Sequence, residues 1–93
     1  MSIRVVFADD HPVVRAGLRA VIAKGGEDIT IVDEAINGKG DLKIAEKSAV
    51  DVYFLNVEMP HLNGIETSER LIKKDPQKNI ILKTTWNTLH IAK

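Results

Sequence analysis

Acidic and amide side chains follow two apolar segments of this sequence, at the positions where strands would end. Asp9 and Asp10 come directly after Ile3–Ala8, and Asn56 comes directly after Val52–Leu55. Ligands of open α/β sheets bind beyond the carboxyl ends of parallel strands, so these side chains are expected to meet at one edge of a sheet. Carboxylate and amide oxygens are hard ligands that suit Mg²⁺ or another small divalent cation better than zinc. The sequence therefore predicts a metal or phosphate site.

A hydroxyl group extends this pattern. Thr84 ends a further apolar run, so its side chain is expected at the same edge, where it can hydrogen-bond a bound anion. Residues 51–64 join a strand pattern to turn chemistry at Pro60 and Asn63-Gly64. This stretch organises the predicted site, because it carries Asn56 and the loop that follows it.

The elements that must position these residues alternate between strand and helix patterns. The apolar runs at 3–8 and 52–55 are typical of parallel strands buried on both faces. Residues 29–35 and 79–84 predict two more strands. The first two helices are predicted from apolar residues at helical spacing, which are Val14, Leu18, Val21 and Ile22, then Leu42, Ala45 and Ala49.

A third helix is predicted to begin after Asn63, which forms a capping-box pair with Glu66. Asn87 is a candidate cap for a short helix near the end of the sequence. The pattern is β-α-β-α-β-α-β with a helical stub. Such alternation predicts an α/β fold, a doubly wound parallel sheet with right-handed crossovers and helices on both faces.

Size and composition indicate one small domain of 93 residues, 44% hydrophobic and 28% charged, as is ordinary for a soluble globular protein. Thirteen basic and thirteen acidic residues cancel, so bulk charge gives no case for nucleic-acid binding. No cysteine is present, which excludes disulfides and thiolate metal sites and favours a cytoplasmic location. No apolar run is long enough for a membrane span, and the early first strand leaves no room for a signal peptide.

Several ordered motifs resemble the receiver domains of two-component response regulators. They are D-D-H-P-x-x-R-x-G-L at 9–18, N-V-E-M-P-x-x-N-G at 56–64 and T-T at 84–85. The first motif is most similar to the NarL/FixJ branch, whose members usually carry a C-terminal LuxR-type helix-turn-helix. The resemblance implies a flavodoxin-like receiver fold with strand order 2-1-3-4 over residues 1–93. Most of the fourth helix, the fifth strand, the fifth helix and any DNA-binding domain would lie outside this chain.

The resemblance also implies a chemistry, which is phosphoryl transfer from a sensor histidine kinase to an aspartate at the end of the third strand. By position, Asp9 and Asp10 match the acid pair that holds Mg²⁺, and the backbone carbonyl of Glu58 matches the third protein ligand. Thr84 matches the hydroxyl residue that bonds the phosphoryl group and shifts on activation.

The phosphoacceptor position departs from the family pattern, because it is Asn56. An amide is a poor nucleophile at neutral pH, so the covalent step of the family is expected to fail. One of three negative charges is also lost, which should weaken Mg²⁺ binding. Two explanations remain open: a natural pseudo-receiver that signals without phosphate, or a substitution made to block phosphorylation.

Lys83 is a second departure, because the family normally has an apolar residue there. A charge in a buried strand is costly unless its end reaches water or the site edge. The phosphate-binding lysine of the family ends the fifth strand, a role that Lys83 is not expected to take. Without that strand, the fourth strand would be an exposed edge, so a homodimer or domain-swapped partner is expected to cover it.

The expected function is therefore that of a receiver module in phosphorelay signalling and transcription regulation, not an enzyme, and not phosphorylatable at Asn56. Its expected partner is a sensor histidine kinase, with no direct contact to nucleic acid from this segment and none to a membrane. Two alternatives are a Mg²⁺-dependent domain that accepts phosphate on another residue, and a pseudo-receiver or engineered fragment that acts only in protein interactions.

Overall fold

The sheet at the centre of the molecule has five strands in the order β2-β1-β3-β4-β5. The structure is a computed structural model that describes residues 2–25, 28–83 and 89–92. The elements, in chain order, are β1 (Ile3–Ala8), α1 (Pro12–Lys24), β2 (Ile29–Ala35), α2 (Gly38–Lys47), β3 (Val52–Asn56), α3 (Gly64–Lys74), β4 (Asn79–Lys83) and β5 (Leu89–Ala92).

The first four strands are parallel and follow the predicted order 2-1-3-4, so the flavodoxin-like receiver fold is confirmed. Their register sets the position of the strand ends. Ala8 pairs with Leu55 across β1 and β3, and Asn56 pairs with Lys83 across β3 and β4. The residues that follow β1 therefore lie beside the end of β3, which in turn lies beside the end of β4.

The last described segment differs from the prediction. Residues 89–92 form β5, which runs antiparallel to β4, in place of the expected helical stub; Asn87 lies outside the described residues. The expectation that β4 would be an exposed edge is also wrong. Unpaired backbone groups on an edge strand favour pairing with any available segment, and here the chain itself supplies that segment.

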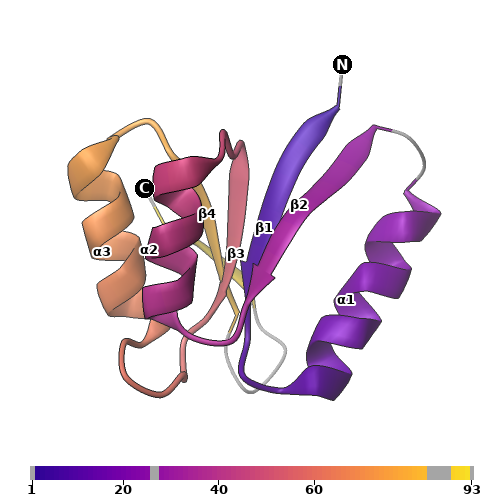
Figure 1. Cartoon of the computed structure of the whole chain (residues 1–93), viewed down its shortest axis with the longest axis horizontal. Helices are drawn as coiled ribbons and strands as arrows, with labels where there is room; N and C mark the ends of the chain where they lie inside the picture. The colour runs from indigo at the N-terminus through magenta and orange to yellow at the C-terminus, as the bar shows by residue number, and fades with distance from the viewer. Residues whose placement is uncertain (1, 26–27, 84–88, 93) are drawn as a thin grey trace.

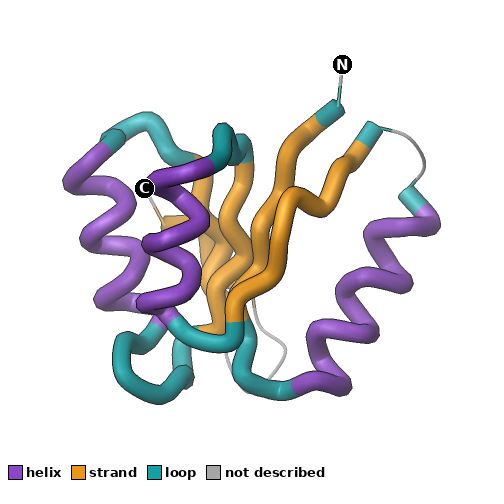
Figure 2. The backbone as a smooth tube through the Cα atoms, in the orientation of Figure 1, coloured by secondary structure: helices purple, strands orange, loops and turns teal. Residues whose placement is uncertain are grey.

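The helices lie on both sides of the sheet (Figure 1). Helices α2 and α3 lie side by side against one face, and α1 lies on the opposite side, where it contacts β2. Figure 2 shows the loops at the carboxyl ends of the parallel strands gathered at the bottom of the view. The predicted capping box is present at the start of α3, where Glu66 N–H donates to Asn63 Oδ1 at 2.8 Å. Among the described residues, none of the helices combines the length and the apolar character that crossing a membrane requires.

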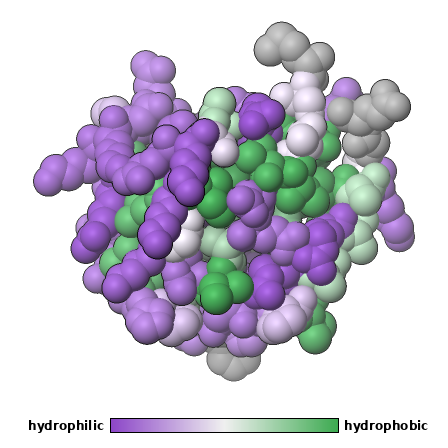
Figure 3. Space-filling view, viewed as in Figure 1, coloured by the Kyte–Doolittle hydropathy of each residue, from purple (hydrophilic) through white to green (hydrophobic). Residues whose placement is uncertain are grey.

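The core lies between the sheet and the pair α2 and α3. The largest buried side chains of this core cluster are Tyr53, Leu55, Leu71 and Ile80. Phe7 is also fully buried, but it alternates with Val6 and Ala8 and so lies on the other face of β1. Figure 3 shows hydrophilic side chains over the outer surface of α2 and α3, with hydrophobic ones in the region toward the sheet and α1. The predicted inward face of α1 is not buried: no residue of that helix is buried.

Candidate functional site

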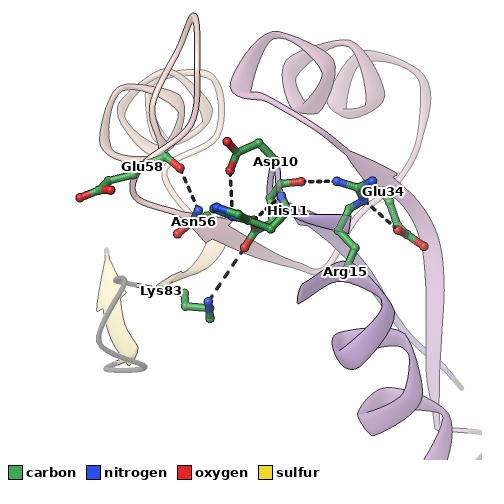
Figure 4. A network of polar contacts seen from close by, with 8 residues as sticks. Asp10, His11, Arg15, Glu34, Asn56, Glu58 and Lys83 are labelled. Carbon is green, nitrogen blue, oxygen red and sulfur yellow. Dashed lines mark hydrogen bonds and ion pairs between the residues drawn. The ribbon is translucent and has the colours of Figure 1, made fainter. Parts of the chain in front are cut away.

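Three strand ends form the candidate site, and Figure 4 shows its side chains pointing toward one another. Asp9 and Asp10 follow β1, Asn56 ends β3 and Lys83 ends β4. The parallel register brings them together, as the sequence predicted for the acids and Asn56. Thr84, the fourth predicted member, lies outside the described residues.

An acidic cluster lies at the end of β1. The side chains of Asp9, Asp10 and His11 each offer a possible ligand atom, and these atoms lie within 4.8 Å of one another. Asp9 is 1% exposed, which makes it the buried member of the cluster. Such a cluster has the ligand types of a metal site, although both oxygens of Asp9 and one oxygen of Asp10 already face nitrogen atoms of the protein.

His11 is one of these partners. Its Nδ1 lies 2.7 Å from Asp9 Oδ1 and 3.1 Å from Asp10 Oδ1, and its backbone N–H donates to Asp9 Oδ1 at 2.9 Å. The hydrogen bond to Asp9, followed by the charge of Asp10, raises the pKa of His11 above its ordinary value. The imidazole of His11 therefore holds the carboxylates of Asp9 and Asp10 together at the start of α1.

Arg15 ties helix α1 to the same strand end. Its Nη1 donates to the backbone carbonyl of Asp9 at 2.7 Å, and its Nε lies 3.5 Å from Glu34 Oε1 on β2. Arg19, one turn further along α1, pairs with the same Glu34 carboxylate. These two arginines belong to one helix face, and they hold its first turns against β1 and β2.

Asn56 is 4% exposed and has a specific role in the loop that follows β3. Its Nδ2 donates to the backbone carbonyl of Glu58 at 2.8 Å, while its Oδ1 is buried and has no hydrogen-bond partner among the described residues. Figure 4 shows this carbonyl facing Asn56 while the Glu58 carboxylate points away. The amide thus binds the same carbonyl that was predicted as a metal ligand.

Gly64 allows the loop to close over the strand end. Its N–H donates to the carbonyl of Val57 at 2.9 Å, and a Cβ at Gly64 would lie 2.2 Å from the carbonyl oxygen of Asn56. Real side chains do not approach backbone so closely, so this position requires glycine. The start of α3 is therefore packed directly on the residue at the centre of the site.

Lys83 reaches the site from β4. Its Nζ lies 4.0 Å from Asp9 Oδ2, and its side chain is 22% exposed. The sequence indicated that the charged end of Lys83 needs either water or the site edge, and the structure places it at that edge. Its contact with Asp9 was not predicted, because it depends on the register between β1, β3 and β4.

The arrangement does not fit a divalent cation as it stands. Both oxygens of Asp9 contact nitrogen atoms, Oδ1 those of His11 and Oδ2 the ammonium of Lys83. The carbonyl of Glu58 accepts a hydrogen bond from Asn56. A metal ion would have to displace these donors and approach a positive charge, which is unfavourable at such short range.

Asp41 on α2 is a buried carboxyl group that the sequence analysis missed. It is 0% exposed, and neither of its side-chain oxygens has a hydrogen-bond partner among the described residues. Burial raises its pKa to about 7, and burial together with the charges of Asp41 and Asp75 raises the pKa of Tyr53 to about 12. Gly38 was the sequence signal for this close packing, because a Cβ there would lie 2.1 Å from Thr67 Oγ1 on α3; in sequence, Asn37-Gly38 was interpreted only as a turn.

Comparisons with known proteins agree with the fold. The family model described as the response regulator receiver domain matches residues 5–93. The chain is 37% identical over 84 residues to the transcriptional regulatory protein YhcZ of Bacillus subtilis, covering 90% of this chain and 39% of that protein. It is 35% identical over 83 residues to the nitrate/nitrite response regulator protein NarL of Escherichia coli K12, covering 89% and 38%. The chain thus spans about two-fifths of the length of these relatives.

Solved structures show the same fold. The receiver domain of AraT from Geobacillus stearothermophilus is 31% identical with a TM-score of 0.82, over 90% of this chain and 65% of that one. The signal receiver domain of NarL from Mycobacterium tuberculosis is 28% identical with a TM-score of 0.79, over 89% and 66%.

Proposed function

Because the chain belongs to the response regulator receiver domain family, with NarL-type regulators among its relatives, we propose that it is a regulatory receiver module that is not phosphorylated at residue 56. The observation that carries this proposal is Asn56. Its amide is a poor nucleophile, and its Nδ2 is hydrogen-bonded to the carbonyl of Glu58. The module then acts through protein contacts rather than through a reaction of its own.

The site residues keep the positions of the family chemistry in this proposal. Asp9, Asp10 and the carbonyl of Glu58 occupy the positions of the Mg²⁺ ligands, and Thr84 occupies the position of the hydroxyl residue that bonds the phosphoryl group. Bound Mg²⁺ would supply neutralisation of charge on a phosphoryl group. The contacts of Asp9 with His11 and Lys83, and the lost charge at Asn56, argue for weak Mg²⁺ binding.

The partners follow from the family. A sensor histidine kinase is the proposed signalling partner, and a second receiver is the proposed dimer partner. Relatives include proteins that extend well beyond the matched segment. One structural neighbour, RcsB from Salmonella enterica serovar Typhimurium, has been solved bound to promoter DNA. We propose that transcription regulation involves a part of the protein other than residues 1–93.

Incubation with a small phosphodonor and Mg²⁺ is expected to leave the mass of the intact chain unchanged. Asn56 cannot form the acyl phosphate, so no stable adduct should appear by mass spectrometry. The matched comparison is Asn56→Asp, which restores a carboxylate at the end of β3 and reports whether the strand-end site can be loaded.

A gain of one phosphate on the unaltered chain would refute the inert receiver and support the alternative, a domain that accepts phosphate on another residue. Fragmentation of the modified chain would then identify that residue. If the parent chain keeps its mass and the Asn56→Asp variant gains one phosphate, the failure of the parent to accept phosphate is due to the amide alone.

A further inference from the structure

Two departures from the receiver pattern change the charge of the strand-end site in the same direction. Asn56 removes a negative charge, and Lys83 adds a positive one. The two residues are paired neighbours across β3 and β4, so both changes fall at one place in the sheet. Asp9 and Asp10 are left as the acidic members of the site.

The buried carboxylate of Asp9 needs a cation. Its side chain is 2% exposed, and an isolated carboxylate is strongly disfavoured away from water unless it is paired and hydrogen-bonded. Asp9 Oδ1 is bonded by His11, which leaves Oδ2 facing Lys83 Nζ at 4.0 Å. Figure 4 shows the Lys83 side chain directed from the end of β4 into the site.

The Glu58 carbonyl is also satisfied from within the protein. Asn56 Nδ2 donates to it at 2.8 Å, so the amide occupies the oxygen that faces the site from the β3 loop. An aspartate at this position would present oxygen to oxygen and would need a cation between the two groups. With asparagine at position 56, no cation is needed between this side chain and the Glu58 carbonyl. Lys83 likewise removes the need for a metal cation beside Asp9.

We propose that the Lys83 ammonium acts as a tethered counter-ion in place of a divalent cation, so that the strand-end site is independent of Mg²⁺. Lys83 and Asn56 act together: one neutralises Asp9, and the other satisfies Glu58. The inference rests on the proposed receiver function only for the location of the metal site. It assigns a role to Lys83 that differs from phosphate binding, since the partner of its ammonium is a carboxylate.

The test is the binding of Mn²⁺, a paramagnetic probe for Mg²⁺ sites, to the purified chain without any phosphodonor. The concentration of free Mn²⁺ is measured by electron paramagnetic resonance. Binding of Mg²⁺ is then measured by its ability to displace bound Mn²⁺ from the chain. The unaltered chain is expected to show no saturable binding at millimolar Mn²⁺. Lys83→Met, which keeps the apolar stem and removes the charge, is expected to show saturable binding at least about tenfold tighter than this millimolar limit, because metal affinity follows ligand charge.

Lys78→Met is the matched control. Lys78 precedes the same strand, is similarly half-buried at 25% exposed, and pairs with Asp75 at 3.7 Å, away from the strand-end site. It loses the same charge from the chain as a whole, so it is expected to behave like the parent. Lys83→Arg, which keeps the charge, is also expected to remain without saturable binding. Lys83→Gln replaces Lys83→Met if the methionine variant fails to fold.

Saturable Mn²⁺ binding by the unaltered chain would overturn the proposal, whatever the variants do. Equal affinities of Lys83→Met and Lys78→Met would overturn it as well, since the effect would then be one of net charge. The assay contains no phosphodonor, so its result is separate from the phosphorylation test. A phosphate on the parent chain would refute the proposed function and leave the metal measurement to be decided independently.

Discussion

Replacing Asp41 by asparagine is expected to stabilise the domain by about 4 kcal/mol above about pH 7, and by little in acid. The carboxyl group is fully buried, and its oxygens have no hydrogen-bond partner among the described residues. Burial therefore raises its pKa from 3.8 to about 7. Folding at neutral pH must either bury a charge or take up a proton, and asparagine requires neither.

The sign of the pH dependence follows from the direction of this shift. Because the pKa of Asp41 is higher in the folded state, the folded state binds more protons than the unfolded state between the two pKa values. The contribution of the neutral carboxyl group is fully present below about pH 4. It is lost as the pH rises toward about 7, and the stability then levels off.

Chemical denaturation at a series of pH values measures this effect. Asp41→Asn should lose the fall in unfolding free energy between acid and neutral pH that the parent shows. Glu69→Gln is the control, because Glu69 is an exposed carboxylate on α3. It should keep the pH profile of the parent. If the unfolding free energy of Asp41→Asn changes with pH in the same way as that of the parent, burial of the Asp41 carboxyl group does not cause the pH dependence, and the prediction is contradicted.

Replacing Gly64 by alanine is expected to destabilise the fold by about 3 kcal/mol, as overpacking against fixed backbone does. The new Cβ would lie 2.2 Å from the carbonyl oxygen and 2.8 Å from the carbonyl carbon of Asn56. Neither atom is the end of a flexible side chain, so the start of α3 and the end of β3 would have to separate. The hydrogen bond from Gly64 N–H to Val57 is then strained or lost.

Gly17→Ala is the matched control, measured by thermal and chemical unfolding beside Gly64→Ala. Gly17 lies within α1, and a Cβ there would meet no atom within 4 Å. Alanine favours helix over glycine, so this variant should gain about 0.5–1 kcal/mol. Equal stabilities of the two variants would show that the loop after β3 yields more easily than its packing indicates.

The parallel sheet could be predicted from the sequence because each of its four parallel strands is marked by a local run of apolar residues. The apolar runs Ile3–Ala8 and Val52–Leu55, each followed by polar residues, predicted both the strands and the edge of the sheet at which the site forms. The capping box at Asn63 and Glu66 was predictable for the same reason, since its partners are three residues apart.

Features that depend on tertiary packing were missed. The segment Leu89–Ala92 has no strong local preference, and its pairing with β4 decides its conformation. The periodicity of α1 was correct, yet its contact with β2 covers Val14, Leu18 and Ile22 only in part, and Val21 is 69% exposed. Asp41 reads as a surface acid in a helical first turn, and only the packing of α2 against α3 and the sheet buries it.

The weak attachment of α1 has a consequence for motion over time. None of its side chains is buried, and a helix of 13 residues is marginal on its own in water. It is therefore the element expected to open first by local unfolding, with amide protons that exchange before those of β1 and β3. Each opening withdraws Arg15 from the carbonyl of Asp9. For the lifetime of that open state, Lys83 on the sheet is the cation that stays beside the Asp9 carboxylate.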